Sequence, residues 1–124
     1  MLKYLVIGVG DFLGALARYV LGTYIGSRYG SAFPYETFVI NVSGSFLVGF
    51  ILTFLAKSTA SPYWRYLIPI GFIGAYTTFS TFEYETLRAV QDGQIAAGVV
   101  NVVLSNLVGF AAVWAGVVTG RIFG

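Results

Sequence analysis

The sequence predicts an all-α membrane protein with four transmembrane helices. Apolar residue types make up 57% of the 124 residues and charged types only 10%, whereas a soluble domain carries about 25% charged residues. Four stretches are predominantly apolar over the length of about 20 residues that a helix needs to cross a bilayer. The connectors between them are too short to form a domain outside the membrane, so we expect one four-helix transmembrane domain over residues 1–124.

The four predicted spans differ in their charged residues. The first contains Asp11 and Arg18, and the second contains none. The third is apolar as far as Phe82, with a helical pattern that continues to Val90, and the fourth is the longest uncharged stretch. The first span lacks the cleavage site of a signal peptide, so we expect it to be retained. The spans are residues 4–26, 37–56, 66–90 and 95–120.

The composition argues against several classes of function. The chain has no cysteine and no histidine, which removes disulfides, cysteine metal sites and the commonest general base. Glu83 and Glu85, near one end of the third span, form the only acid pair within a span. We therefore expect no enzyme. The net charge of +2 comes without a basic cluster, so no nucleic-acid partner is expected.

The basic residues give a weak prediction of orientation. Lys and Arg concentrate in the cytoplasmic loops of membrane proteins. Here they divide between the two sides of the membrane, with Lys3, Lys57, Arg65 and Arg121 on the side of the termini, Arg28 and Arg88 on the other, and Arg18 nearer the second group. This small bias leads to the hypothesis that the chain inserts both ways round and pairs antiparallel.

A polar row runs along the second span. Residues at intervals of four lie on one face of a helix, and here they are Thr37, Asn41, Ser45, Gly49 and Thr53. Polar groups at membrane depth must face protein or water. The row therefore serves helix packing or lines a path for a solute, and both interpretations remain open. Asn41 is the strongest candidate for a solute contact, because its amide can donate two hydrogen bonds to an anion.

The other spans hold small and polar residues with open roles. Small residues four apart favour close helix packing. The fourth span also holds polar residues that cannot all lie on one helix face. We therefore expect at least one of them to make a structural hydrogen bond. The small residues are Gly10 with Gly14, Gly22 with Gly26, Ser45 with Gly49, and Ala112, Gly116 and Gly120 in series; the polar residues are Asn101, Ser105 and Asn106.

Two charged residues lie within the first span. Asp11 and Arg18 are on the same helix face but about 10 Å apart along its axis, too far for a direct pair. Charged residues inside spans are candidates for function. Arg18 either attracts an anion at a vestibule or reaches the lipid headgroups. Asp11 would repel an anion unless it is paired or protonated.

The third span carries the densest polar chemistry. Residues 71–85 read GFIGAYTTFSTFEYE, with hydroxyl side chains interleaved with Phe79 and Phe82. Glycines and hydroxyls weaken a helix, and we expect a break near residues 74–77. Freed carbonyls would suit a hard monovalent cation, and freed N–H groups or phenyl edges an anion. The alternative is an unbroken helix whose hydroxyls bond back to the preceding turn.

This stretch closely resembles the signature of the Fluc/CrcB family of fluoride channels. The resemblance extends over the whole chain in length, number of spans and order of motifs, and the third-span motif is the most specific part. The matching residues are 77–82 (TTFSTF) with Gly71, Gly74 and Glu85, supported by 14–19, 37–41 and 106–109.

The resemblance implies an antiparallel, dual-topology homodimer in the cell inner membrane, with two pores that export fluoride passively. It further implies an aromatic box from Phe79 and Phe82, with the Asn41 amide facing the ion. A structural Na⁺ at the dimer interface would be bound by the backbone carbonyls of Gly74 and Thr77.

The same resemblance implies roles for four further polar residues along the pore. Ser80 and Thr81 would form a hydroxyl track, and Glu85 would lie beyond it. Arg18 would match the arginine of the family's first span.

Four residues depart from the family pattern. Ala75 replaces a usual glycine, which leaves its carbonyl available. Glu83 adds charge near one pore end, and Phe110 replaces a frequent serine. Asp11 stands where the residue is usually small and uncharged. None of the four lies in the central hexapeptide.

Two other functions compete with the fluoride channel. A small dual-topology multidrug exporter would use one acidic residue, here Asp11, to exchange protons for cations. That class does not call for Arg18 on the same face or for the hydroxyl and phenyl cluster of the third span. A subunit of a membrane assembly without transport is the third interpretation, and the glycine pairs allow it.

Overall fold

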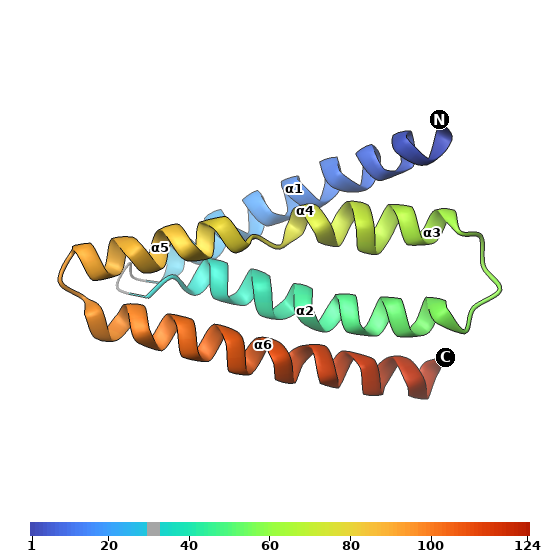
Figure 1. The fold of residues 1–124 in the computed structure, drawn as a ribbon. Helices are drawn as coiled ribbons and strands as arrows, with labels where there is room; N and C mark the ends of the chain where they lie inside the picture. The colour runs from blue at the N-terminus through green and yellow to red at the C-terminus, as the bar shows by residue number, and fades with distance from the viewer. Residues whose placement is uncertain (30–32) are drawn as a thin grey trace.

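The computed structural model describes residues 1–29 and 33–124, in which all regular structure is helical. Residues 30–32, within the connector expected between the first two spans, lie outside the described residues. Both termini lie at the end of the molecule that also holds the α2–α3 connector, and the α5–α6 turn lies at the opposite end (Figure 1). The elements are α1 (Leu2–Arg28), α2 (Tyr35–Ala56), α3 (Tyr63–Arg65), η1 (Tyr66–Ile73), α4 (Gly74–Tyr76), α5 (Phe79–Gln91) and α6 (Ile95–Phe123).

Three helices of the described chain are long and apolar enough to cross a membrane by themselves: α1, α2 and α6. The third predicted span is divided among α3, η1, α4 and α5, which together run beside α2 (Figure 1). The all-α prediction is confirmed. Because the third span is interrupted, it does not form one continuous membrane-crossing helix.

Glycine contacts hold α2 and α6 together. A Cβ atom on Gly49 would meet the Val113 carbonyl, and one on Gly116 would meet the Phe46 carbonyl. The backbones of the two helices therefore approach each other closely, as small residues allow in membranes. The packing role predicted for the small residues of the fourth span is confirmed at Gly116.

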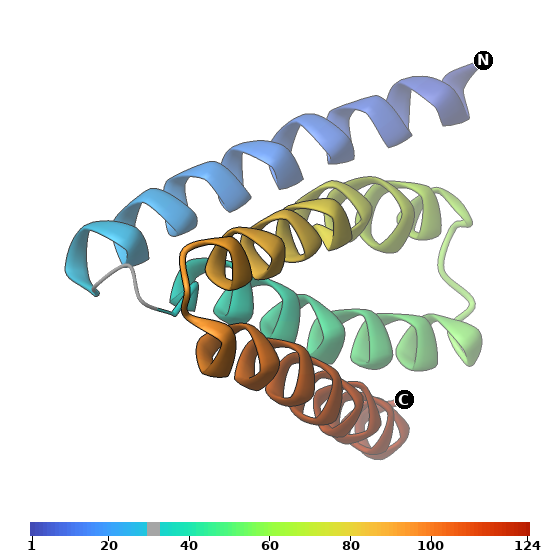
Figure 2. The same cartoon turned by 60° about the vertical axis from the view of Figure 1, so that its left-hand side comes forward.

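The α1 helix also packs against η1 through glycines that let the two backbones approach closely. Gly10 and Gly14 are buried, and a Cβ atom on either would meet the backbone of η1, at Leu67 and Phe72 respectively. Gly71 of η1 is equally close to α1, since its Cβ would lie 2.8 Å from the Ile7 carbonyl oxygen. Figure 2 shows α1 at the edge of the bundle, with one side against the third span. Large apolar side chains on the side of α1 away from η1, such as Leu5, Phe12 and Tyr19, are exposed in the described chain.

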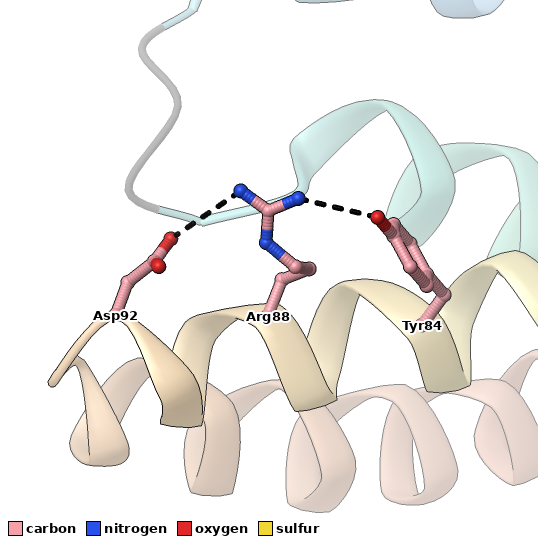
Figure 3. Close-up of polar contacts among 3 residues, drawn as sticks. All are labelled: Tyr84, Arg88 and Asp92. Atoms are coloured by element: carbon pink, nitrogen blue, oxygen red, sulfur yellow. Dashed lines mark hydrogen bonds and ion pairs between the residues drawn. The ribbon is translucent and has the colours of Figure 1, made fainter.

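A tight turn at Asp92 and Gly93 joins α5 to α6. Gly93 has a φ angle of 81°, a conformation that glycine adopts without strain. Arg88 donates to the Tyr84 hydroxyl at 3.2 Å and lies 3.9 Å from an Asp92 carboxylate oxygen (Figure 3). These groups are exposed, so the ion pair adds little stability.

Candidate functional site

The third span is broken at Thr77 and Thr78. Their φ/ψ angles of −82°/156° and −149°/115° are extended, between the end of α4 and the start of α5. The break was predicted near residues 74–77, and it lies one residue further along the chain. Gly74 is still helical. The Thr78 hydroxyl accepts from the Thr81 N–H at 3.3 Å, so Thr78 caps α5 and determines where the helix restarts.

The segment before the break is a π-helix. The η1 helix contains Pro69 and ends at Ile73. Proline has no N–H to donate, and wide turns of this kind are frequent at functional sites. The Thr77 N–H and hydroxyl both donate to the Ile73 carbonyl, each at 3.1 Å. The last turn before the break is therefore held by Thr77 itself.

The Asn41 side chain of α2 bonds to both backbone groups of Thr78 in the unwound segment. Its Nδ2 donates to the Thr78 carbonyl at 2.9 Å, and its Oδ1 accepts from the Thr78 N–H at 2.8 Å. The side-chain amide thus pairs with Thr78 as a neighbouring strand would. One Nδ2 hydrogen is left over, so Asn41 has a single donor for an anion and not the two expected from the residue type.

Arg18 of α1 binds the other side of the break. Its Nε donates to the Ala75 carbonyl at 3.0 Å. In a continuous helix that carbonyl would accept from the N–H of Phe79. The Arg18 side chain therefore reaches inward to the break and not to the headgroups. The Ala75 carbonyl, which was expected to be available, is occupied by Arg18.

The break also frees carbonyls that suit a cation. The Thr78 N–H would bond to the Gly74 carbonyl in a continuous helix, but it donates to Asn41 instead. Unwound carbonyls are the usual ligands for Na⁺ in membrane proteins. Within residues 1–29 and 33–124, no cluster of three or more acidic side chains could bind a metal ion. At the break, the Gly74 carbonyl loses its helical N–H partner and has the chemistry of a ligand for a hard cation.

A cleft of about 380 Å³ brings together most of the expected ion-contacting residues. Asn41, Phe79 and Phe82 line it, and so do Gly74 and Thr77. The two phenyl rings lie 5.9 Å apart between centroids and are tilted by 45°. A ring presents a positive edge, so this cleft combines an amide donor and aromatic edges at the N-terminal end of α5.

A second cavity, of about 330 Å³, lies between α1, α2 and α5, and three further expected residues line it. These are Arg18, Thr81 and Glu85, together with Glu36. The Thr81 hydroxyl oxygen accepts from the Thr78 hydroxyl at 3.0 Å. One carboxylate oxygen of Glu85 is buried and has no hydrogen-bond partner among the described residues. Thr78 lines both cavities.

The expected residues are thus divided between two cavities, and Ser80 lines neither of them. Ser80 is exposed in the first turn of α5. The helix N-terminus there carries N–H groups without helical partners and the positive end of the helix dipole. A hydroxyl at this position adds one further donor on the same side.

Asn106 of α6 was not among the site residues expected from the sequence. It lines the cleft with Phe79 and Phe82, and also an adjoining cavity of about 520 Å³ that the same two rings line. Its Nδ2 donates to the Val102 carbonyl at 2.8 Å. Two features of the sequence pointed to it, namely its polar side chain inside a span and the family resemblance at residues 106–109.

Asn101 makes the structural bond that was expected of one polar residue in the fourth span. It is 2% exposed. Its Nδ2 donates to the Thr86 hydroxyl at 3.0 Å, and its Oδ1 accepts from Ser105 at 3.1 Å. Both ends of the amide are therefore satisfied within the α5–α6 interface.

The remaining departures from the family pattern lie outside the cleft. Asp11 is exposed on α1 and lines neither of the two cavities. Phe110 is 76% exposed on α6. Glu83 lines the adjoining cavity, beside Phe79 and Phe82. Of the three, only Glu83 is close enough to influence an ion near the rings.

Comparisons with known proteins agree on one family. The family model described as "CrcB-like protein, Camphor Resistance (CrcB)" matches residues 5–117. A protein of Acidobacterium capsulatum is 57% identical over 121 residues, covering 97% of both chains. One of Solibacter usitatus is 49% identical over 121 residues, covering 97% of this chain and 99% of its own. Both relatives bear the name fluoride-specific ion channel FluC.

Proposed function

The chain belongs to the CrcB family, and from that premise we infer that it is a fluoride-specific ion channel of the cell membrane. We propose that it lets F⁻ leave the cell passively, which lowers the fluoride concentration of the cytoplasm. One observation carries the proposal: the backbone of the third span is unwound at Thr77 and Thr78, beside a cleft lined by Asn41, Phe79 and Phe82. Irregular backbone at membrane depth is tolerated where it lines a cavity or is buried in protein.

In this proposal the cleft holds the partly dehydrated ion. The edges of Phe79 and Phe82 face F⁻ with their positive rims. The remaining Nδ2 hydrogen of Asn41 replaces part of its hydration shell. Asn106 lines the same cleft and offers a second amide. The low polarity of the rings keeps the site dry, which strengthens each of these contacts.

The N-terminal turn of α5 continues the proposed path. Ser80 and Thr81 supply hydroxyl donors at the positive end of the α5 dipole. Arg18 lines the second cavity and stabilises the break through its bond to the Ala75 carbonyl, and Glu85 in the same cavity limits how tightly the anion binds there. A channel needs sites that are favourable enough to enter and weak enough to leave.

We further propose that two copies pair antiparallel, giving two pores, with a Na⁺ between them. Gly74, Phe79 and Ser80 are exposed in the single chain, although residues at a break in the bilayer need protein around them. A second copy would supply that cover. Gly74 and Thr77 contribute two carbonyls from each chain, and a hard cation is bound by more oxygens than one chain offers here.

The test is anion release from liposomes that contain the purified protein. We expect fast fluoride release and retained chloride, measured with ion-selective electrodes on the same preparation. Protein-free liposomes are the control. Equal leakage of both anions, or no leakage of either, would overturn the assignment.

A further inference from the structure

We propose that α1 forms an antiparallel contact with α1 of a second copy, in which Asp11 of each chain pairs with the Arg18 guanidinium of the other. The proposal rests on the antiparallel dimer of the proposed function and specifies one of its interfaces. It begins from two charged groups in α1 that the single chain leaves incompletely paired.

Within residues 1–29 and 33–124, Asp11 has no cationic partner. The one ion pair in the part of the chain that the structure describes joins Arg88 to Asp92. Asp11 lies nine residues after the start of α1, which is about 13 Å along the axis. Its short side chain cannot reach the membrane surface from there, and an exposed carboxylate at that depth is costly unless something pairs with it.

Among the described residues, Arg18 has hydrogen-bond donors without acceptors, which complement the Asp11 carboxylate. Its Nε is bonded to the Ala75 carbonyl, and across the described residues its two Nη groups make no hydrogen bond. Those groups are the two donors that a carboxylate engages. Arg18 is seven residues after Asp11, so both side chains leave α1 on nearly the same side, about 10 Å apart.

The spacing favours an antiparallel partner over a parallel one. When two copies of α1 run antiparallel and cross between Gly14 and Ala15, position 11 of each lies opposite position 18 of the other. Two identical ion pairs then form around the twofold axis. In a parallel pair, Asp11 would face Asp11 and Arg18 would face Arg18, and like charges would repel. The charges of α1 are therefore self-complementary in one orientation only.

The small residues between these charges leave room for the second helix. We call Gly8, Asp11, Ala15, Arg18 and Gly22 the charged strip of α1; they span about 80° of the helix surface. Arg18 and Gly22 also line the second cavity, so a second α1 helix would cover that cavity. A Cβ atom on Gly8 would meet nothing within 4 Å, and one on Gly22 would meet only the Ile40 Cδ1 atom at 3.5 Å. Packing within the chain does not require these glycines, unlike Gly10 and Gly14 on the inner side.

Cysteine crosslinking tests the proposal in a chain that has no native cysteine. Ala15→Cys should crosslink to itself with a short bis-maleimide in membranes. Gly8→Cys and Gly22→Cys, in differently tagged chains, should crosslink to each other but not each to itself. Leu13→Cys is the matched control, because it is 48% exposed at nearly the same depth but on the other side of α1. Fluoride release by Ala15→Cys before crosslinking shows that the variant is folded.

The outcomes separate this inference from the proposed dimer. If the protein is dimeric by single-molecule photobleaching but Ala15→Cys does not crosslink, the α1 contact is wrong and the dimer stands. Crosslinking of Leu13→Cys, or of Gly8→Cys with itself, also overturns the contact. If the protein is monomeric in liposomes, both the dimer and the contact are wrong.

A charge variant gives a second readout. Asp11→Leu should raise the dissociation constant of the dimer on the order of tenfold, since the dimer loses two polar contacts and each such contact in a membrane strengthens association about threefold. If Asp11 faced lipid instead, leucine would remove a costly charge and leave association unchanged or tighter. That result would overturn the ion pair.

Discussion

At the scale of single residues, Asn41 combines a structural and a candidate transport role in one side chain. It bonds to both backbone groups of Thr78 and also lines the cleft. Asn106 lines the same cleft, but its one hydrogen bond goes to a carbonyl within its own helix. The two amides therefore differ in what their removal leaves unsatisfied.

Asn41→Ala should impair both stability and fluoride release. It leaves the Thr78 N–H and carbonyl without partners, and each buried unsatisfied group costs about 1–3 kcal/mol. Asn106→Ala removes an amide from the cleft without exposing a backbone group, so it should lower release and leave the free energy of unfolding nearly unchanged. Denaturant unfolding in detergent and liposome release measure the two effects. Equal destabilisation by the two substitutions would contradict this account of Asn41.

Phe82→Ala should slow fluoride release more than Phe110→Ala does. The Phe82 ring lines the cleft beside Phe79, whereas Phe110 is 76% exposed on α6. Loss of a ring contact of about 0.5–1.5 kcal/mol corresponds to about a 2- to 10-fold slower rate. Initial release rates at equal protein density are the measurement. Equal effects of the two substitutions would mean that the pair of rings serves packing alone.

At the scale of elements, the helices are held together by backbone approach at a few glycines. A Cβ atom at Gly116 of α6 would collide with the Phe46 carbonyl of α2. At Gly109 of the same helix, a Cβ atom would lie 3.9 Å from the Ser45 hydroxyl oxygen, which is an ordinary contact. One helix therefore offers both a required and a replaceable glycine.

Gly116→Ala should destabilise the protein by about 1–3 kcal/mol, because the added methyl forces α2 and α6 apart. Gly109→Ala should be neutral or stabilising by up to about 1 kcal/mol, because alanine favours the helix. Thermal unfolding of both variants in the same detergent checks the difference. A similar loss of stability in both would argue against close approach at Gly116.

The elements also show how far the sequence predicts this structure. Hydropathy was sufficient to predict four helical segments, and the hydroxyl-rich stretch was sufficient to predict a break in the third. The position of the break was displaced because Gly74 remains helical and Gly71 packs against α1. The break occurs where Thr78 caps α5 and Asn41 pairs with its backbone.

The sequence predicted which residues belong to the site, but not which groups those residues bond to. Asn41 and Arg18 were identified as candidates, but their bonds to Thr78 and Ala75 join residues 37 and 57 positions apart. Helical periodicity within one span carries no information about such contacts. For the same reason Asn106 was missed, since its position beside the rings depends on how α6 packs against α5.

At the scale of the whole molecule, the two ends of the bundle differ in charge. Four basic residues and no acidic side chain belong to the end that holds the termini, namely Lys3, Lys57, Arg65 and Arg121. The opposite end holds Glu36, Asp92, Arg28 and Arg88. An antiparallel pair places one end of each type on both membrane faces, so the dimer as a whole has no preferred orientation.

Reporters fused to the C-terminus, active on one side of the membrane only, should therefore detect both orientations. The expected result is comparable activity from a cytoplasmic and a periplasmic reporter, since an excess of four basic residues over two is a small bias for orientation. Adding three lysines after Gly124 is the control, because it should shift the balance toward one side. A single orientation of the unmodified chain would contradict antiparallel insertion.

Asp11→Asn should retain fluoride release at high protein density, because Asp11 lines neither cavity of the site. A proton-coupled exporter would instead depend on this carboxylate. Fluoride release and uptake of a cationic dye, measured on the same vesicles, distinguish the two functions. Loss of proton-coupled dye transport in the variant would favour the exporter.

The order of the chain has a consequence for how the break forms during synthesis. Membrane segments leave the ribosome from the N-terminus onward, so α1 and α2 enter the bilayer before the third span. Arg18 and Asn41 are then already present when Ala75 and Thr78 arrive with unpaired backbone groups. A rearranged chain that began at the α2–α3 connector would insert the same segment without these partners, and we expect it to be retained as a continuous helix or rejected by the insertion machinery.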